Sequence, residues 1–232
     1  MKIGIIAALA AEAENITAKM EEPRRVSVPS LTFTEGKIGG ADVICTVCGV
    51  GKVYAAAAAE AMILKFAPDL VINTGVGGTL TDKLTIGDVA VASSVCQHDF
   101  DCTAIGEEPG AVNVPGAEGA HIPADKKTAR EIVAIAERLG VRTCVGPIAS
   151  GDQFIADRER KKKIVDTFSA VACEMEGGAV GQVCAANGVP FCVIRAISDS
   201  ADGGAPEDFP AFVKKSAEVS ARIVTELARA LG

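Results

Sequence analysis

The chain has 232 residues, a formal net charge of −7 and 49% hydrophobic residues. Such a composition excludes an intrinsically disordered chain, and this length allows a core that needs no disulfide or metal to hold it together. The acidic balance argues against nucleic acid or an anionic membrane as a partner. At about 100–200 residues per domain, residues 1–232 are predicted to form a single domain.

The first predicted element is a buried strand, Lys2–Ala8. This apolar run followed by small residues also resembles a short signal peptide, but its only preceding charge is Lys2, which favours the strand. The longest stretch without charge, Gly177–Ile194, contains Gly188 and Pro190. It is therefore predicted to form a helix, a turn and a strand, and no membrane span is expected.

Apolar runs alternate with amphipathic segments along the whole chain. The predicted strands are Lys2–Ala8, Asp42–Cys48, Asp69–Thr74, Asp88–Ser94, Val141–Ala149, Ala170–Glu174 and Pro190–Ile197. The predicted helices are Ala11–Glu22, Val53–Phe66, Lys126–Leu139, Asp157–Phe168, Gly178–Asn187 and Asp208–Ala230. Near-continuous Val, Ile and Ala runs are typical of strands covered on both faces, so this alternation predicts an α/β fold with a largely parallel sheet.

Two segments between these elements stand out. Gly106–Gly119 is a long irregular stretch rich in Gly and Pro, and loops of this length in a compact domain are often functional. Arg158–Lys163 has five basic residues in six. No aromatic residue is interleaved, which favours a solvated helix face over an anion or nucleic-acid site.

Eight cysteines are spread along the chain, mostly in apolar runs. Cys45 and Cys48 form a CxxC pattern, which can indicate metal or redox chemistry. They lie within the apolar run Val43–Val50, where strand residues three apart point to opposite faces, and no second Cys or His pair stands nearby. The pattern favours buried thiols, no metal or other cofactor, and a reducing, cytoplasmic location.

Ligands of parallel α/β sheets bind beyond the carboxyl ends of the strands. The segments that follow the predicted strands include several acids, one aromatic residue and glycine-rich turns: Glu12, Gly49–Lys52, Gly75–Gly78, Gly151–Ile155, Glu174–Glu176 and Ser198–Asp199. The glycine-rich turns have two readings, a phosphate cradle or simple tight turns. Neither the turn at Gly49–Lys52 nor the turn at Gly75–Gly78 matches a dinucleotide-binding or P-loop motif.

Three of these acids, Glu12, Asp199 and Glu176, also have two readings each. Glu12 shares the apolar stripe of its helix with Ile16 and Met20, which suits either a general base or favourable placement in the first helical turn. Asp199 is either an acid that protonates a leaving group or a helix cap or ion pair. Glu176 stands two residues after Glu174, and two buried acids repel each other, so at least one of them requires another partner.

At these same residues the chain resembles the nucleoside phosphorylase/hydrolase superfamily, and within it the 5′-methylthioadenosine/S-adenosylhomocysteine nucleosidases. The segments that carry the resemblance span nearly the whole chain in order: Lys2–Ala8 with Glu12, Gly49–Val53, Ile72–Gly75, Gly87-Asp88, His98-Asp99, Ser150–Asp152, Phe154-Ile155, Glu174–Glu176 and Arg195–Asp199. The resemblance implies a three-layer α/β/α sandwich around a mixed, twisted, barrel-like sheet. It also implies hydrolysis of the N-glycosidic bond of 5′-methylthioadenosine or S-adenosylhomocysteine, with release of adenine, and a homodimer.

The resemblance further implies roles for individual residues. Asp199 would protonate adenine N7, Glu12 would activate water, and Glu176 would bind the ribose hydroxyls. The substrate-binding residues would be Val50, Val76, Phe154, Ile155, Met175, Arg195, Ser198 and Phe209. These acids suit the chemistry, because bond cleavage places positive charge on the sugar and negative charge on the leaving purine.

Three features of the chain depart from the family pattern or refine it. Val76 stands where many members have Ser, close to the expected water. The loop that a partner subunit would lend to the pocket, Ile105–Pro115, has few aromatic residues. No Arg or Lys lies in Ala7–Ala11 or Asn73–Thr79, where related phosphorylases bind phosphate, so water is the expected nucleophile. A nucleosidase acting on another 5′ group, aminofutalosine-type or 5′-deoxyadenosine, and a non-catalytic nucleoside-binding or storage protein remain the alternatives.

Overall fold

The computed structural model describes residues 1–202 and 209–232, and for residues 209–213 it gives the backbone alone. Across these ranges, ten strands form one sheet. The strands are β1 (Lys2–Ala7), β2 (Glu21–Val28), β3 (Leu31–Ile38), β4 (Ala41–Val47), β5 (Leu70–Thr79), β6 (Val89–Gln97), β7 (Ile122–Pro123), β8 (Thr143–Ser150), β9 (Ala172–Glu174) and β10 (Phe191–Asp199).

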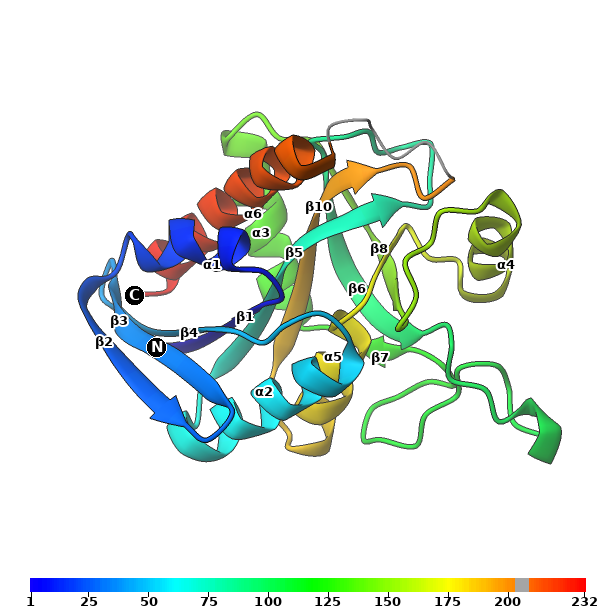
Figure 1. The fold of residues 1–232 in the computed structure, drawn as a ribbon, viewed down its shortest axis with the longest axis horizontal. Helices are drawn as coiled ribbons and strands as arrows, with labels where there is room; N and C mark the ends of the chain where they lie inside the picture. Colours follow the sequence, from blue (N-terminus) through cyan, green and yellow to red (C-terminus); the bar gives the residue numbers. More distant parts are fainter. Residues whose placement is uncertain (203–208) are drawn as a thin grey trace.

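Five of the strands close into a barrel. The neighbours run β10-β6-β8-β9-β5, and β5 pairs again with β10, which completes the ring. β10 is parallel to β5 but antiparallel to β6, so the barrel is mixed. β1, β4, β3 and β2 extend the sheet from β5, as Figure 1 shows. The expected barrel-like mixed sheet is confirmed.

Helices cover both faces of the sheet. The helices are α1 (Ala10–Thr17), α2 (Lys52–Phe66), α3 (Lys126–Arg138), α4 (Arg158–Phe168), α5 (Gly177–Ala186) and α6 (Phe209–Leu231), with a short 3₁₀ turn, η1 (Thr103–Ile105). One apolar cluster joins α1, α3 and α6 to the strands, and a second joins α2 and α5 to the opposite face (Figure 1). This is the predicted α/β/α arrangement, with α4 packed separately through Ile164 and Phe168.

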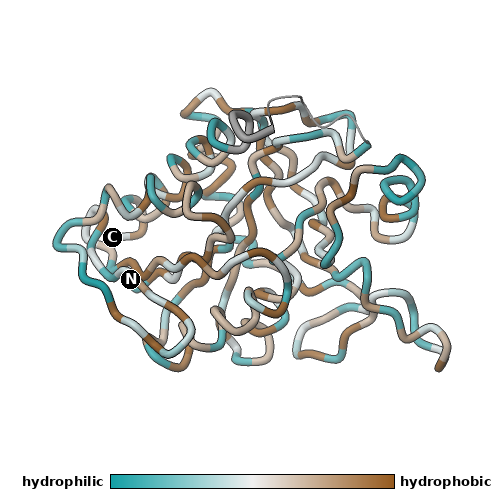
Figure 2. Tube along the Cα trace, in the orientation of Figure 1, coloured by the Kyte–Doolittle hydropathy of each residue, from teal (hydrophilic) through white to brown (hydrophobic). Residues whose placement is uncertain are grey.

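The prediction missed a hairpin. The helix predicted over Ala11–Glu22 ends at Thr17, and β2 and β3 follow it as an antiparallel pair. β2 is exposed along most of its length and carries Pro23 among charged residues, so neither alternation nor an apolar run marks it. Figure 2 shows hydrophilic residues along β2 and α4 and hydrophobic ones along the central strands. The two-residue strand β7 was likewise too short for any periodicity.

The second predicted glycine-rich turn is also wrong, because residues 75–78 lie inside β5. A Cβ atom on Gly75 would lie 2.6 Å from Glu12 Oε1, and one on Gly78 would lie 2.6 Å from Asp199 Oδ1. Real side chains cannot approach so closely. Glycine here allows two acidic side chains to rest against the backbone of the strand.

Candidate active site

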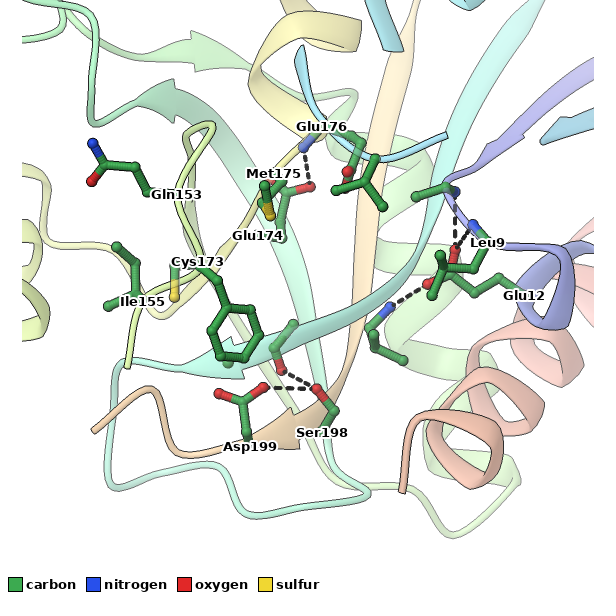
Figure 3. A pocket seen from close by; sticks show the side chains of 16 residues that line it. Leu9, Glu12, Gln153, Ile155, Cys173, Glu174, Met175, Glu176, Ser198 and Asp199 are labelled. Atoms are coloured by element: carbon green, nitrogen blue, oxygen red, sulfur yellow. Dashed lines mark hydrogen bonds between the residues drawn. The ribbon is translucent and has the colours of Figure 1, made fainter. Parts of the chain in front are cut away.

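A cavity of about 190 Å³ lies where β1, β5, β9 and β10 meet the loops before α2 and α4. Its lining, drawn in Figure 3, is Ala8, Leu9, Glu12, Val50, Val76, Gly77, Gly78, Gln153, Phe154, Ile155, Cys173, Glu174, Met175, Glu176, Ser198 and Asp199. Four acids therefore face one cavity with largely apolar walls. Lys, Arg and His are absent among these described lining residues.

Glu12 is held by backbone donors at the junction of β1 and α1. Its Oε2 accepts hydrogen bonds from the N–H groups of Ala8 (2.9 Å) and Leu9 (2.8 Å). Its Oε1 accepts from the N–H of Val76 at 3.1 Å (Figure 3). Both readings of Glu12 are therefore present: it caps the start of its own helix, and it presents a buried carboxylate to the cavity. Burial raises the pKa of Glu12 despite these donors and the nearby Arg195.

Asp199 is the last residue of β10, buried on the opposite side of the cavity from Glu12 (Figure 3). Its Oδ1 accepts from the N–H of Ala201 at 2.9 Å, and its Oδ2 accepts from Ser198 Oγ at 2.9 Å. The alternative reading of Asp199 as a helix cap does not hold, since the next helix begins at Phe209. The side chain also forms no ion pair within residues 1–202.

Glu176 and Glu174 lie side by side but have different partners. Glu176 Oε1 accepts from the N–H of Gly51 at 2.9 Å, so the glycine-rich turn after β4 holds a carboxylate. Arg195 forms an ion pair with Glu174 and stands 3.7 Å from Glu176 Oε2. The predicted need for a partner is thus confirmed, and the partner is an arginine whose own side chain is 1% exposed.

The pKa of Glu176 is raised to about 7. Burial is the main cause, and repulsion from Glu174 adds to it; Arg195 and the Gly51 N–H act in the opposite direction. A carboxyl group with such a pKa exchanges its proton near neutral pH, which is a common property of active-site acids.

Apolar side chains form one wall and the mouth of the cavity. Ile155 is buried, whereas the ring of Phe154 is 55% exposed at the cavity edge. Leu9 and Val50, both partly exposed, also line the cavity, and Met175 lies beside Glu174 and Glu176 (Figure 3). A flat, aromatic and apolar wall of this kind suits a purine ring.

Most of the predicted site residues share this cavity. Catalytic candidates Glu12, Glu176 and Asp199 line it, and so do Val50, Val76, Phe154, Ile155, Met175 and Ser198. Arg195 does not line the cavity; it lies behind Glu176. The side chain of Phe209 lies outside the described residues.

The network that supports these acids was not predicted from the sequence. Glu174 also accepts hydrogen bonds from Ser150 Oγ and from the N–H groups of Glu176 (3.0 Å) and Gly177 (2.8 Å). Arg195 donates to both the carbonyl oxygen and the side chain of Asn73. The only local signal was the adjacency of the two acids, because Asn73 and Arg195 are far apart in the sequence.

The remaining cysteines and charges have structural explanations. Cys45 and Cys48 pack into opposite apolar clusters, and burial raises the pKa of each to about 12. Residues 1–202 and 209–232 hold no group of acids, cysteines and histidines suited to a metal ion.

The basic run on α4 is mostly exposed, which confirms the solvated helix face. In the part of the chain described, no helix has the length and apolar character needed to cross a membrane.

These features define a purine-sized, acid-lined site on an α/β barrel, and the chain belongs to the phosphorylase superfamily, which it matches over residues 2–229. The resemblance stated from the sequence is therefore confirmed. The chain is 42% identical to the 5′-methylthioadenosine/S-adenosylhomocysteine nucleosidase of Shewanella halifaxensis over 232 residues, covering 100% of both chains. It is similar to the structure of the nucleosidase of that name from Neisseria meningitidis in complex with methylthio-immucillin-A, with a TM-score of 0.93, 35% identity and 99% coverage of each chain. It is also similar to the futalosine hydrolase of Helicobacter pylori, with a TM-score of 0.91, 34% identity and coverage of 98% of this chain and 97% of that one.

Proposed function

We propose that the protein hydrolyses the N-glycosidic bond of 5′-methylthioadenosine and S-adenosylhomocysteine and releases adenine. One observation carries the proposal: Glu12, Glu176 and Asp199, from three distant parts of the chain, line the same cavity. The names and identities of its relatives support this substrate class.

Asp199 acts on the leaving group. The C1′–N9 bond breaks with its electron pair passing to adenine, and Asp199 donates its proton to N7 as this charge develops. Ser198 and the N–H of Ala201 fix the carboxyl group, one on each oxygen, which orients it towards the purine. Phe154 and Ile155 cover the ring from the side.

Glu176 and Glu12 act on the sugar and the water. Ionised Glu176 accepts the ribose hydroxyl hydrogen bonds and stabilises positive charge on the sugar ring. The water oxygen bonds to C1′, and Glu12 takes its proton. Three backbone donors hold the Glu12 carboxylate for this purpose. A lining with four acids and no cation among its described residues would repel phosphate, which favours hydrolysis over phosphorolysis.

The decisive experiment measures adenine release from 5′-methylthioadenosine with and without phosphate. Wild-type protein should release adenine at the same rate in both buffers. Asp199→Asn should lower kcat by about 10²–10³-fold, because it removes the proton donor while keeping the shape. Asp166→Asn, on the exposed face of α4, is the matched control and should leave the rate unchanged. Equal rates in Asp199→Asn and wild type would reject the assigned acid, and binding without turnover would indicate a nucleoside-binding protein.

A second candidate is a nucleosidase of the same chemistry acting on a larger 5′ group. The similarity to futalosine hydrolase is about as strong as that to the Neisseria nucleosidase, and Val50 at the mouth is 49% exposed. A substrate panel that varies only the 5′ group separates the two, comparing methylthio, homocysteinyl, hydrogen and aminofutalosine-type groups. A kcat/KM at least tenfold higher for aminofutalosine would favour the second candidate.

The proposal extends to the setting of the enzyme. We place it in the cytoplasm, in methionine salvage, as one domain per chain and two chains per molecule. Eight free cysteines suit a reducing compartment. The loop from Ile105 to Pro115 would complete the pocket of the partner subunit, and Ile105 is 80% exposed.

A further inference from the structure

Glu174 is buried, with a side chain that is 2% exposed, compared with 8% for the side chain of Glu176. Ser150 Oγ donates to its Oε1. Three donors converge on its Oε2: the N–H of Glu176 at 3.0 Å, the N–H of Gly177 at 2.8 Å, and Arg195 Nη2. Although Glu174 borders the cavity, both of its oxygens are therefore occupied by protein donors.

Both terminal nitrogens of Arg195, which lies beside Glu174, also donate hydrogen bonds to protein oxygens. Arg195 Nη2 donates to Glu174 and to Asn73 Oδ1, and Nη1 donates to the carbonyl oxygens of Asn73 (3.2 Å) and Ile194 (2.9 Å). Glu176 Oε2 stands 3.7 Å from Nη2, beyond hydrogen-bond distance. Glu174 thus takes the direct contact with the only cation that faces Glu176 among the described residues.

We propose that Glu174 is a positioning residue, which holds Arg195 and the first turn of α5 so that Glu176 alone remains free to bind the ribose and to exchange a proton. The inference rests on the proposed function, in which Glu176 binds the ribose hydroxyls. Glu174 touches no reacting atom in this scheme. It acts through the position and protonation of its neighbour.

The charged and titratable groups around Glu176 come from every packed element. Glu12 faces it from α1, Cys48 from the residue after β4, Glu174 from β9 and Arg195 from β10. The N–H of Gly51 adds a hydrogen bond from the turn before α2. After burial, the charge of Glu174 is the largest influence that raises the pKa of Glu176. Removing that charge must therefore make Glu176 ionise at lower pH.

The test is Glu174→Gln, measured by the pH dependence of kcat/KM for 5′-methylthioadenosine. Glutamine can keep its carbonyl oxygen towards Arg195 and α5 and turn its amide towards Ser150 Oγ, which accepts a hydrogen bond. We expect the acidic limb of the profile to move down by about one pH unit. A Ser150→Ala control removes two hydrogen bonds, to Glu174 Oε1 and from the N–H of Gly178, but no charge, so its acidic limb should stay at the wild-type position.

Infrared titration of the protonated carboxyl band provides a readout that needs no turnover. Wild-type protein should lose one carboxyl band near neutral pH, and Glu176→Gln should lack that band. In Glu174→Gln the band should disappear about one pH unit lower. An unmoved acidic limb and band in Glu174→Gln would overturn the proposal, as would a Glu176→Gln protein that keeps every carboxyl band of the wild type.

These readouts also separate this inference from the proposed function. If wild-type protein releases no adenine, the proposed function fails, while the infrared titration still reports on Glu174 and Glu176. If Glu174→Gln does not fold, the comparison of wild type with Glu176→Gln still decides whether Glu176 is the group that titrates near neutral pH.

Discussion

At the scale of single residues, the site brings together four acidic side chains that are all buried. Glu12, Glu174, Glu176 and Asp199 all border one cavity, and Arg195 is the nearest cation. Burying a carboxylate disfavours its charged form unless donors or cations compensate. Each acid is compensated to a different extent, and this difference suits the acids to the different roles that the proposed reaction gives them.

The raised pKa of Glu176 predicts a stability effect with a definite sign. Since this pKa rises from 4.5 to about 7 on folding, the protonated form is favoured in the folded state. Its contribution to the free energy of unfolding is fully present below pH 4.5 and is lost as the pH rises through 7. Glu176→Gln mimics the protonated form and escapes this loss. We expect the variant to gain about 3 kcal/mol relative to wild type between pH 4 and pH 8, measured by urea unfolding at both pH values. A difference that does not change with pH would contradict the assignment.

We expect the substitution Gly78→Ala to reduce activity more than it reduces stability. A Cβ atom there would lie 2.6 Å from Asp199 Oδ1 and 2.9 Å from Ala201 Cβ, so Gly78→Ala must displace the acid. We expect kcat for adenine release to fall at least tenfold, since small displacements of catalytic groups are costly. Gly146→Ala is the matched control: the three atoms nearest to its Cβ would all belong to Val171, which does not line the cavity. It should reduce the melting temperature with little change in kcat.

At the scale of secondary-structure elements, one ionic cluster ties three strand-end loops together. Lys52 Nζ, at the start of α2, donates to Asp99 Oδ1 at 2.6 Å, and Asp99 Oδ2 accepts from the N–H of Asp152 at 2.9 Å. Asp152 Oδ1 in turn accepts from the N–H of Lys52 at 2.7 Å. The turn that holds Glu176 and the loop that carries Phe154 are therefore joined.

This cluster predicts that Asp99→Asn destabilises the protein. The Lys52–Asp99 pair has side chains only 18% and 17% exposed, so its loss should lower the free energy of unfolding by about 1–2 kcal/mol. Asp42→Asn is the control, because the Lys37–Asp42 pair is 3.6 Å apart and 57% exposed on both sides. Exposed pairs contribute little, so the control should unfold at the wild-type urea concentration. Equal midpoints for the two variants would show that the cluster has no stabilising role.

Patterns local in sequence predicted most of these elements. The strands of the barrel and all six helices follow from apolar runs and 3.6-residue periodicity, because burial fixes which residues are apolar. The hairpin of β2 and β3 could not be found, since β2 is mostly exposed and its position depends on pairing rather than on burial. The glycines of β5 looked like a turn, because the acids that require them lie on α1 and β10.

The difference between patterns local in sequence and contacts between distant residues also applies to the site. Glu12, Glu176 and Asp199 were predicted because each follows a strand, and strand ends converge on one edge of a parallel sheet. The support from Asn73, Ser150 and the backbone of Gly51 was not predictable. These contacts join residues that are distant in sequence and carry no local pattern.

At the scale of the whole molecule, two lining residues of the cavity remain open to solvent within the part of the chain that the structure describes. Phe154 is 55% exposed and Val50 49% exposed, although both would contact the substrate in the proposed reaction. Figure 1 shows the segment after β6, which carries η1, reaching away from the barrel, and none of the described lining residues of the cavity comes from this segment. An enzyme that must exclude bulk water from a sugar cation requires a cover from elsewhere.

The proposed homodimer supplies that cover and predicts the effect of one surface change. Ile105→Asp replaces an apolar side chain, which would be buried against the partner subunit, with a charged one. We expect the variant to shift from dimer to monomer in sedimentation experiments and to raise the KM for 5′-methylthioadenosine about tenfold, which corresponds to about 1.4 kcal/mol of lost binding. Val145→Asp is the control, since this half-exposed side chain borders the groove beside α3 and does not line the acid-lined cavity. It should sediment as a dimer with unchanged KM. A wild-type protein that is monomeric and fully active would show that the mouth is closed by its own chain.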